Sequence, residues 1–303
     1  MELIDNKDIL FIINPNSGGK RAAKVPGELD SLNLNISYII TNDLAELEQA
    51  FRLNIEKYKA FIFVGGDGTV HEALKYLYGR NDRLLGVLPA GSGNGFAREL
   101  GFKNSIKSLL RDTTKGKSIG IDILSVNGNL CINIAGLGLD SFVAYHFHKS
   151  KGRGLRNYIL STIRSVFIFK PFYATLMVDQ QKIQDKFLMI TTGNTRQFGN
   201  NAIISPQSKP FDGIFELVMV KPFPWYLYPI FIIRMFMGSL KDSKYISYLK
   251  VKDSVKIMSE FKKYHIDGEP KIFNDSLSVK MLEHKINVIK TEHYKIIRAY
   301  GSS

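Results

Sequence analysis

The chain has little cysteine and fewer acidic than basic residues, and both features limit the class of protein to which it can belong. It has one cysteine, and 28 Asp and Glu residues stand against 41 Lys and Arg residues. With Cys131 alone no intrachain disulfide can form, which is compatible with a reducing cytoplasm. Cys131 lies in an apolar run, where a buried filler is expected rather than a nucleophile. Residues 1–8 lack a basic region and a long apolar stretch, so no secretory signal is expected.

The chain also lacks an uninterrupted apolar run of membrane-spanning length. Residues 222–240 are about long enough, but they contain three prolines and, near the middle, Arg234. The sequence instead predicts a loop and one helix over residues 225–238, which either covers the core or lines a lipid-entry surface. The aromatic residues at its start suit a membrane interface and a protein core equally well.

Several common nucleotide and nucleic-acid signatures are missing. There is no G-x-x-x-x-G-K-[ST] loop, no G-x-G-x-x-G fingerprint and no H-R-D with D-F-G. There is also no zinc-finger spacing and no ribonucleoprotein aromatic motif, so no nucleic-acid partner is expected. The net charge of +13 would also attract an anionic membrane surface.

Three apolar runs each end in a loop rich in Gly, Ser and Asn that leads into a helical pattern. The runs are residues 9–13, 60–64 and 84–88, and the loops are residues 14–20, 65–69 and 89–98. In an open parallel sheet the carboxyl ends of the strands lie along one edge, where ligands bind. Glycines let a backbone approach a ligand closely, and a helix start offers free N–H groups to an anion. The three loops therefore indicate a phosphate site.

Asp67 lies inside the second of these loops. A carboxylate there would repel phosphate unless a metal or a proton transfer involves it, so Asp67 indicates Mg-nucleotide chemistry. The structural alternative is a turn aspartate that caps the helix at Val70.

The chain divides into two patterns. Residues 1–118 alternate strand and helix, which predicts an α/β domain with a parallel sheet covered by helices on both faces. Residues 119–290 are rich in strands, with helices inserted at about 140–168 and 225–238, which predicts a mainly antiparallel β domain. The first of these helices interleaves basic residues such as Arg156 with apolar ones. It is either an ordinary amphipathic helix or one that rests on an anionic bilayer.

The three loops carry N-P-x-S-G, then G-G-D-G-T, then P-x-G-[ST]-x-N. With these motifs nearly the whole chain resembles the catalytic domain of diacylglycerol kinases, sphingosine kinases and bacterial lipid kinases. The resemblance implies an NAD-kinase/phosphofructokinase-like first domain, ATP and Mg²⁺ as cofactors, and a lipid hydroxyl in a membrane as acceptor, with diacylglycerol favoured. It also implies that residues 291–303 return to pack on the first domain.

The resemblance assigns roles to four acids. Asp67 would belong to the metal and phosphate network. Asp267-Gly268-Glu269 would supply the base that takes the hydroxyl proton, with Glu269 favoured over Asp267, although by sequence alone this segment is a solvated hairpin turn. Asp122 matches an acidic family position at the domain junction, and its alternative is a polar residue on a half-exposed strand.

The resemblance also gives a nucleotide set and a metal set. The nucleotide-contacting positions are Asn14, Ser17, Gly18, Thr41, Gly65, Gly66, Gly68, Thr69 and Ser92, while Asn42 and Asp43 could instead form a turn and a helix cap. For a structural Mg²⁺, Asp212 would give its side chain, and Lys209 and Ile214 their backbone oxygens. An Asp-Gly turn needs no metal, so a plain turn is the alternative.

The third loop departs from many bacterial diacylglycerol kinases. Gly95 follows Asn94 where they have Asp, and His71-Glu72 also resembles sphingosine kinases. A sphingoid-base kinase therefore stays open, as do an NAD-type kinase and a non-catalytic lipid- or nucleotide-binding regulator. The apolar residues 222–240 argue against a soluble substrate, and the retained acids argue against a non-catalytic role. We expect a cytoplasmic protein associated peripherally with an anionic membrane, and we leave open a homodimer.

Overall fold

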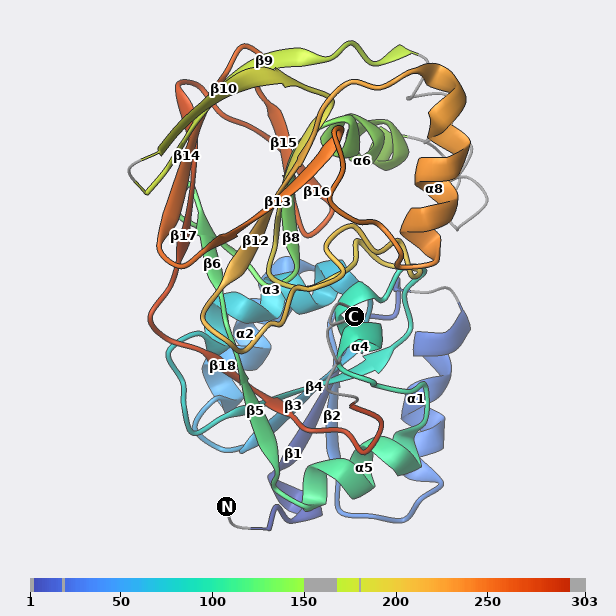
Figure 1. The fold of residues 1–303 in the computed structure, drawn as a ribbon. Coiled ribbons are helices and arrows are strands. Elements are labelled where there is room, and N and C mark those ends of the chain that lie inside the picture. Colours follow the sequence, from blue (N-terminus) through green and yellow to red (C-terminus); the bar gives the residue numbers. More distant parts are fainter. Residues whose placement is uncertain (1–2, 18–19, 150–167, 180, 295–303) are drawn as a thin grey trace. The chain divides into compact units, whose positions relative to one another are not determined.

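The protein is described by a computed structural model that covers residues 3–17, 20–149, 168–179 and 181–294 (Figure 1). These residues form two compact units. The first unit contains the chain up to Ile121 and the described residues from His284 onward, and the second unit runs from Asp122 to Glu283. Each unit is described by itself below.

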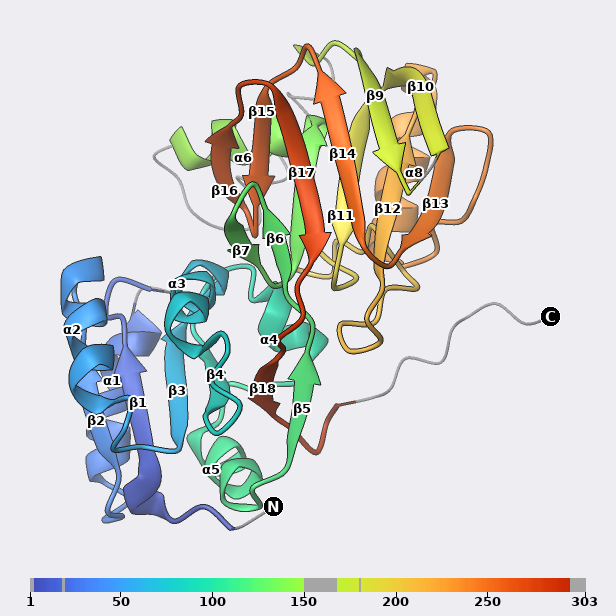
Figure 2. The same cartoon turned by 90° about the vertical axis from the view of Figure 1, so that its left-hand side faces the viewer.

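The first unit is built on a six-stranded sheet in the order β2-β1-β3-β4-β18-β5 (Figure 2). Strands β1 to β4 pair in parallel, as the sequence predicts. Strand β18 is parallel to β4 and antiparallel to β5. The strands are β1 (Ile9–Ile13), β2 (Ser37–Ile40), β3 (Ala60–Gly65), β4 (Leu84–Pro89), β5 (Ser118–Ile121) and β18 (Ile286–Ile289).

Helices cover both faces of this sheet. The Phe51 ring of α2 stacks on Phe61 and Phe63 of β3 and on Tyr76 of α3, so α2 and α3 share one face. A Cβ placed on Gly86 of β4 would contact Leu109, which puts α5 on the other face. Strands covered on both faces become continuous apolar runs, which is why β1, β3 and β4 were visible in the sequence. The helices are η1 (Asn6–Asp8), α1 (Lys20–Asp30), α2 (Leu44–Asn54), α3 (Asp67–Leu77), α4 (Gly95–Glu99) and α5 (Ile106–Thr114).

The second unit consists of two antiparallel six-stranded sheets, as predicted for this half. Their orders are β10-β9-β14-β17-β6-β7 and β13-β12-β11-β8-β15-β16. The first sheet contains β6 (Leu124–Val126), β7 (Asn129–Cys131), β9 (Phe172–Val178), β10 (Gln181–Phe187), β14 (Ser254–Ser259) and β17 (Ser276–Met281). The second contains β8 (Ile134–Gly138), β11 (Met189–Gly193), β12 (Phe215–Val220), β13 (Ile246–Val251), β15 (Lys263–Ile266) and β16 (Glu269–Ile272). Within the described residues its helices are α6 (Leu139–Lys149), η2 (Trp225–Leu227) and α8 (Tyr228–Phe236).

The structure differs from the sequence-based predictions in two respects, namely the sheet to which two strands belong and the continuity of two apolar runs. Strands β5 and β18 belong to the sheet of the first unit, although residues 119–290 were assigned to the second domain. Their buried apolar residues reveal a strand without revealing its sheet. The apolar runs 121–126 and 130–135 each look like one strand in the sequence, but they are interrupted at Asp122 and Asn133, because both residues hydrogen-bond to other segments.

Some predictions lie outside the described residues. These are Gly18, the basic and apolar residues of the helix beyond residue 149, and the last part of the predicted C-terminal return, residues 295–303. Among the helices that the structure describes, none combines the length and the apolar character needed to cross a bilayer.

Candidate functional site

The second and third glycine-rich loops of the first unit meet backbone to backbone. A Cβ on Gly91 would lie 2.5 Å from Gly66 Cα, so glycine is required at this contact. The N–H groups of Ala90 and Gly91 both donate to the Gly65 carbonyl, at 2.9 and 3.3 Å. In the second loop, a Cβ on Gly65 would clash with the Thr69 side chain. The loops that follow β3 and β4 are therefore in direct backbone contact.

Asp67 joins these two loops. It is the first residue of α3, and its carboxylate accepts hydrogen bonds from the N–H groups of Gly95 (2.9 Å) and Phe96 (3.0 Å), the first two residues of α4. Asp67 thus caps α4, while Val70 N–H donates to the Gly66 carbonyl. The predicted alternative, that Asp67 caps its own helix at Val70, is therefore wrong, because α3 has no side-chain cap and Asp67 caps α4 instead.

Asn94 holds the third loop and was not among the predicted site residues. Its backbone is left-handed at φ 50°, and its side-chain amide donates to the Gly91 carbonyl at 2.7 Å. The Asn94 Oδ1 atom is buried and has no hydrogen-bond partner within the described residues. The final Asn of the third motif was the sequence signal for this role. Gly95, which departs from the bacterial pattern, uses its N–H on Asp67.

The first loop and the end of β2 complete this edge of the sheet. The Asn14 side chain accepts from Asn16 N–H at 3.0 Å, and buried Thr41 donates its backbone N–H to Ile13 at 2.9 Å. Asp43 caps α2 by accepting from Glu46 N–H at 2.9 Å, which confirms the cap proposed for it. The remaining predicted positions also follow strands at this edge, namely Ser17 after β1, Gly68 after β3 and exposed Ser92 after β4.

In the second unit, Asp267 and Gly268 form the two-residue turn between β15 and β16. Both have positive φ, 51° and 92°, as such hairpin turns require. The Asp267 carboxylate accepts from the N–H groups of Ile132 (3.2 Å), Asn133 (2.8 Å) and Ile134 (3.2 Å). A solvated hairpin turn is therefore an incomplete description, because this acid fixes the break between β7 and β8.

Glu269 differs from Asp267. It is partly exposed, and its carboxylate makes no hydrogen bond or ion pair with a residue that the structure describes. Of the two acids in the Asp267-Gly268-Glu269 segment, Glu269 is the one whose carboxylate has no partner among the described residues.

His265, Asp140 and Thr191 form a chain of polar contacts that begins at the Asp267-Gly268 turn. Gly268 N–H donates to His265 Nδ1 at 3.3 Å, so Nε2 carries the proton and faces Asp140 Oδ2 at 3.4 Å. Asp140 also accepts from Thr191 Oγ1 at 2.8 Å, and the side chains of Asp140 and His265 are both buried. A Cβ on Gly136 would lie 1.8 Å from Asp140 Oδ2, so this packing needs a glycine. No local motif marks His265 or Asp140, so neither was predicted from the sequence.

Asp122 lies with the predicted metal residues of the second unit. Its buried carboxylate accepts from Gly213 N–H at 2.7 Å, and Asp212 accepts from Ile214 N–H at 3.1 Å. Burial raises the pKa of Asp212, and the charge of Asp122 adds to this shift. The Lys209 carbonyl accepts from Phe211 N–H at 2.8 Å, and one carbonyl can accept twice.

The donor set at this turn fits a weak Mg²⁺ site. Two carboxylates and a carbonyl are oxygen ligands, and Mg²⁺ commonly keeps several waters. Within the described part of the chain, no three or more His, Cys, Asp or Glu side chains are grouped to hold a metal ion. The turn can therefore offer two carboxylates, from Asp122 and Asp212, and must leave other positions to carbonyls and water.

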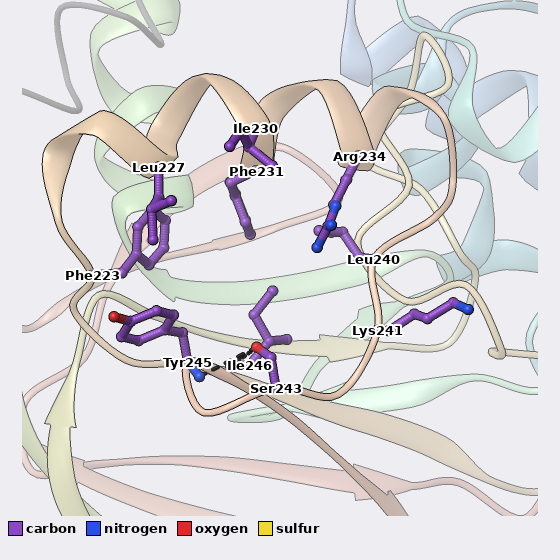
Figure 3. Close-up of a pocket in the computed structure, with 10 residues that line it drawn as sticks. All are labelled: Phe223, Leu227, Ile230, Phe231, Arg234, Leu240, Lys241, Ser243, Tyr245 and Ile246. Carbon is purple, nitrogen blue, oxygen red and sulfur yellow. Dashed lines mark hydrogen bonds between the residues drawn. The ribbon is translucent and has the colours of Figure 1, made fainter.

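The second unit also has a small pocket of about 110 Å³ beneath α8 (Figure 3). Its wall comes from α8 and from the segment that leads into β13. Figure 3 shows Phe223 and Leu227 at one end and Arg234 and Lys241 at the other. The pocket thus combines an apolar wall with the guanidinium of Arg234, whereas the Lys241 ammonium points away from it.

Comparisons with known proteins match both halves of the chain. The diacylglycerol kinase catalytic domain matches residues 8–126, and the YegS C-terminal NAD kinase beta sandwich-like domain matches residues 133–289, more than half of the chain. A diacylglycerol kinase of Bacillus subtilis (strain 168) is 28% identical over 269 residues, which cover 86% of this chain and 88% of that protein.

Solved structures show the same fold. A crystal structure of a candidate diacylglycerol kinase from Bacillus anthracis str. Sterne is 25% identical with a TM-score of 0.77, and the match covers 94% of this chain and 97% of that one. An NAD kinase from Archaeoglobus fulgidus shares the fold at 14% identity and a TM-score of 0.56, with 94% of each chain covered. The chain therefore belongs to the lipid-kinase family that joins a diacylglycerol kinase catalytic domain to a YegS-type C-terminal domain.

Proposed function

We propose that the protein transfers the γ-phosphate of ATP to a lipid hydroxyl, with diacylglycerol as the favoured acceptor. The observation that carries the proposal is the bonding of Asp67 to Gly95 and Phe96. Asp67 thus lies between two glycine-rich loops and at the start of α3, which is where we expect a phosphate to bind.

The first unit would bind ATP with Mg²⁺. The Asp67 carboxylate lies against the backbone N–H groups of Gly95 and Phe96, and its oxygens are of the kind that Mg²⁺ binds. Mg²⁺ is commonly bound by one or two carboxylates together with substrate phosphates, which suits this loop. When bound, it would neutralise charge on the transferring phosphoryl group. The loop N–H groups would orient the phosphates.

The second unit would supply the base. The lipid hydroxyl oxygen bonds to the γ-phosphorus, the bond to ADP breaks, and the hydroxyl proton passes to Glu269. Glu269 is favoured over Asp267 because the Asp267 carboxylate already accepts three backbone N–H groups. Asp267 and His265 would keep the turn in place. Asp122 would help to hold Mg²⁺ at the turn that contains Asp212, because its carboxylate lies at that turn.

Two observations support diacylglycerol as acceptor. The relative from Bacillus subtilis carries that name and aligns over most of both chains. The pocket beneath α8 offers an apolar wall for part of an acyl chain, and Arg234 at its other end would repel the ammonium group of a sphingoid base.

The test is transfer of labelled γ-phosphate from ATP, with Mg²⁺, to lipids in mixed micelles. The panel holds diacylglycerol, monoacylglycerol, sphingosine, ceramide and phosphatidylglycerol, with NAD as the soluble control. We expect labelled phosphatidic acid from diacylglycerol. Labelled sphingosine would move the acceptor to the sphingoid bases, and labelled NAD alone would overturn the lipid proposal. Asp82→Asn, which removes an exposed acid paired with Arg83, is the matched control for Asp67→Asn and should retain activity.

A further inference from the structure

The outer face of η2 and α8 carries a row of exposed apolar side chains. We call this row the α8 stripe, and its residues are Trp225, Tyr226, Ile230, Ile233 and Met237. Their exposed fractions run from 48% for Ile230 to 73% for Met237. From Tyr226 onward the residues are spaced by four, three and four positions, which places them on one helix face.

The opposite face of α8 is already occupied. Met235 is buried there, and Tyr228 and Phe231 pack against the core of the second unit. A surface helix normally keeps polar residues on its outer side, so a helix that is apolar on both sides has an outer face suited to a second apolar medium.

Charge favours an anionic partner. Residues 221–241 contain Lys221, Arg234 and Lys241 and no Asp or Glu. Lys221 pairs with Asp185, whereas Arg234 and Lys241 have no ion pair with any residue in the described ranges. Two such cations beside the stripe, on a chain with a net charge of +13, would attract anionic headgroups.

The stripe also has the composition of an interfacial element. Trp225 and Tyr226 begin it, and these amphipathic rings concentrate where a membrane meets water. Helix α8 has nine residues, too few to span a bilayer, so it can only lie along the surface.

We propose that the α8 stripe docks the protein on an anionic phospholipid bilayer, with its apolar side chains inserted and Arg234 and Lys241 at the headgroups. The same helix lines the pocket beneath it, so docking would bring the pocket next to the lipid phase. The purpose of docking rests on the proposed function, because a lipid acceptor resides in the lipid phase.

Trp225 makes the docking directly measurable, because it is the only tryptophan of the chain. Its emission is recorded on the full chain with vesicles of phosphatidylglycerol and phosphatidylcholine, and with vesicles of phosphatidylcholine alone. We expect a blue shift and quenching by brominated phospholipid with the anionic vesicles, and weaker binding as salt rises. Emission that is unchanged by anionic vesicles would overturn the proposal.

A double variant, Ile233→Glu with Met237→Glu, places two carboxylates within the stripe and changes no residue of the pocket lining. It should weaken vesicle partitioning by about tenfold or more, because two apolar side chains lose their burial in lipid. Leu53→Glu on α2 is the matched control, since Leu53 is exposed to a similar degree, and it should partition like the wild type. Equal partitioning of the stripe variant and the wild type would contradict the docking site.

The failure of docking and the failure of the proposed activity are separable. Phosphoryl transfer to a short-chain, water-soluble diacylglycerol needs no vesicle, so the stripe variant should retain it, which also shows that the variant is folded. Wild-type protein that shifts its Trp225 emission but transfers no phosphate would leave docking standing and remove the proposed function. A dimer in sedimentation velocity that the stripe variant dissociates would make the stripe a contact between copies and overturn docking.

Discussion

Asp67 in the first unit and Asp267 in the second hold their surroundings in similar ways. Each lies at a glycine-containing turn, and each carboxylate accepts backbone N–H groups from another segment. Asp67 reaches Gly95, 28 residues along the chain, whereas Asp267 reaches Asn133 across 134 residues. In both units an acid that was predicted for chemistry also fixes the backbone.

Glu269 differs from Asp67 and Asp267, because its carboxylate has no partner among the described residues. An acid that holds backbone N–H groups cannot be neutralised without loosening the fold, whereas a partnerless acid can. Conservative substitutions therefore separate the structural role of each acid from its chemical role.

Asp67→Asn should have the largest effect. We expect turnover to fall about 10³-fold, because the variant loses the charge that would hold the metal. The amide would also turn an N–H toward Gly95 or Phe96, which should cost about 1–3 kcal/mol of stability. Turnover in the micelle assay and urea unfolding check the two effects, and turnover within twofold of the wild type would remove Asp67 from the site.

Glu269→Gln and Asp267→Asn form a pair. We expect Glu269→Gln to lower turnover about 10²-fold and to leave urea unfolding unchanged, because a general base is lost and no contact is broken. Asp267→Asn should also cost about 1–3 kcal/mol of stability, since its amide cannot accept all three N–H groups. Full turnover in a folded Glu269→Gln protein would transfer the role of base to Asp267.

Gly91→Ala tests the contact between the two loops. The added Cβ would lie 2.5 Å from Gly66 Cα, so we expect a loss of about 1–3 kcal/mol in stability and a raised KM for ATP. Gly27→Ala on α1 is the control, because nothing lies within 4 Å of its Cβ position, and it should stabilise by about 0.5–1 kcal/mol. A KM for ATP that Gly91→Ala leaves unchanged would argue against a nucleotide at these loops.

Glu216 should show the smallest effect, in the pH dependence of stability. It is buried on β12, burial raises its pKa, and the hydroxyl of Ser205 donates to it. The folded state then favours the protonated form, so this contribution is fully present below the unfolded pKa and is lost as pH rises through the folded pKa. Glu216→Gln cannot ionise and should flatten the decline in stability above pH 4.5, as urea unfolding at several pH values would show. An unchanged slope would contradict this role of the buried carboxyl.

The sequence predicted the first unit better than the second for a physical reason. Strands β1 and β3 are buried on both faces and end in glycine-rich loops, so their signals are local. Strands β15 and β16 are short and carry polar residues such as Lys263 and Glu269, so no periodicity marks them. The D-G-E turn was found through resemblance, but the contacts of Asp267, and the pair of His265 with Asp140, join segments far apart in sequence. No local pattern could reveal them.

The position of β18 sets an order of events during synthesis. It fills the slot between β4 and β5, and Asn287 bonds the Asn81 carbonyl across 206 residues. At about 5–20 residues per second, a ribosome needs on the order of ten to forty seconds to make that interval. All strands of the second unit's two sheets emerge during this time, while β4 keeps an unpaired edge in the nascent chain. Such an edge is a site for pairing with other chains, so the nascent protein is exposed to aggregation until β18 emerges.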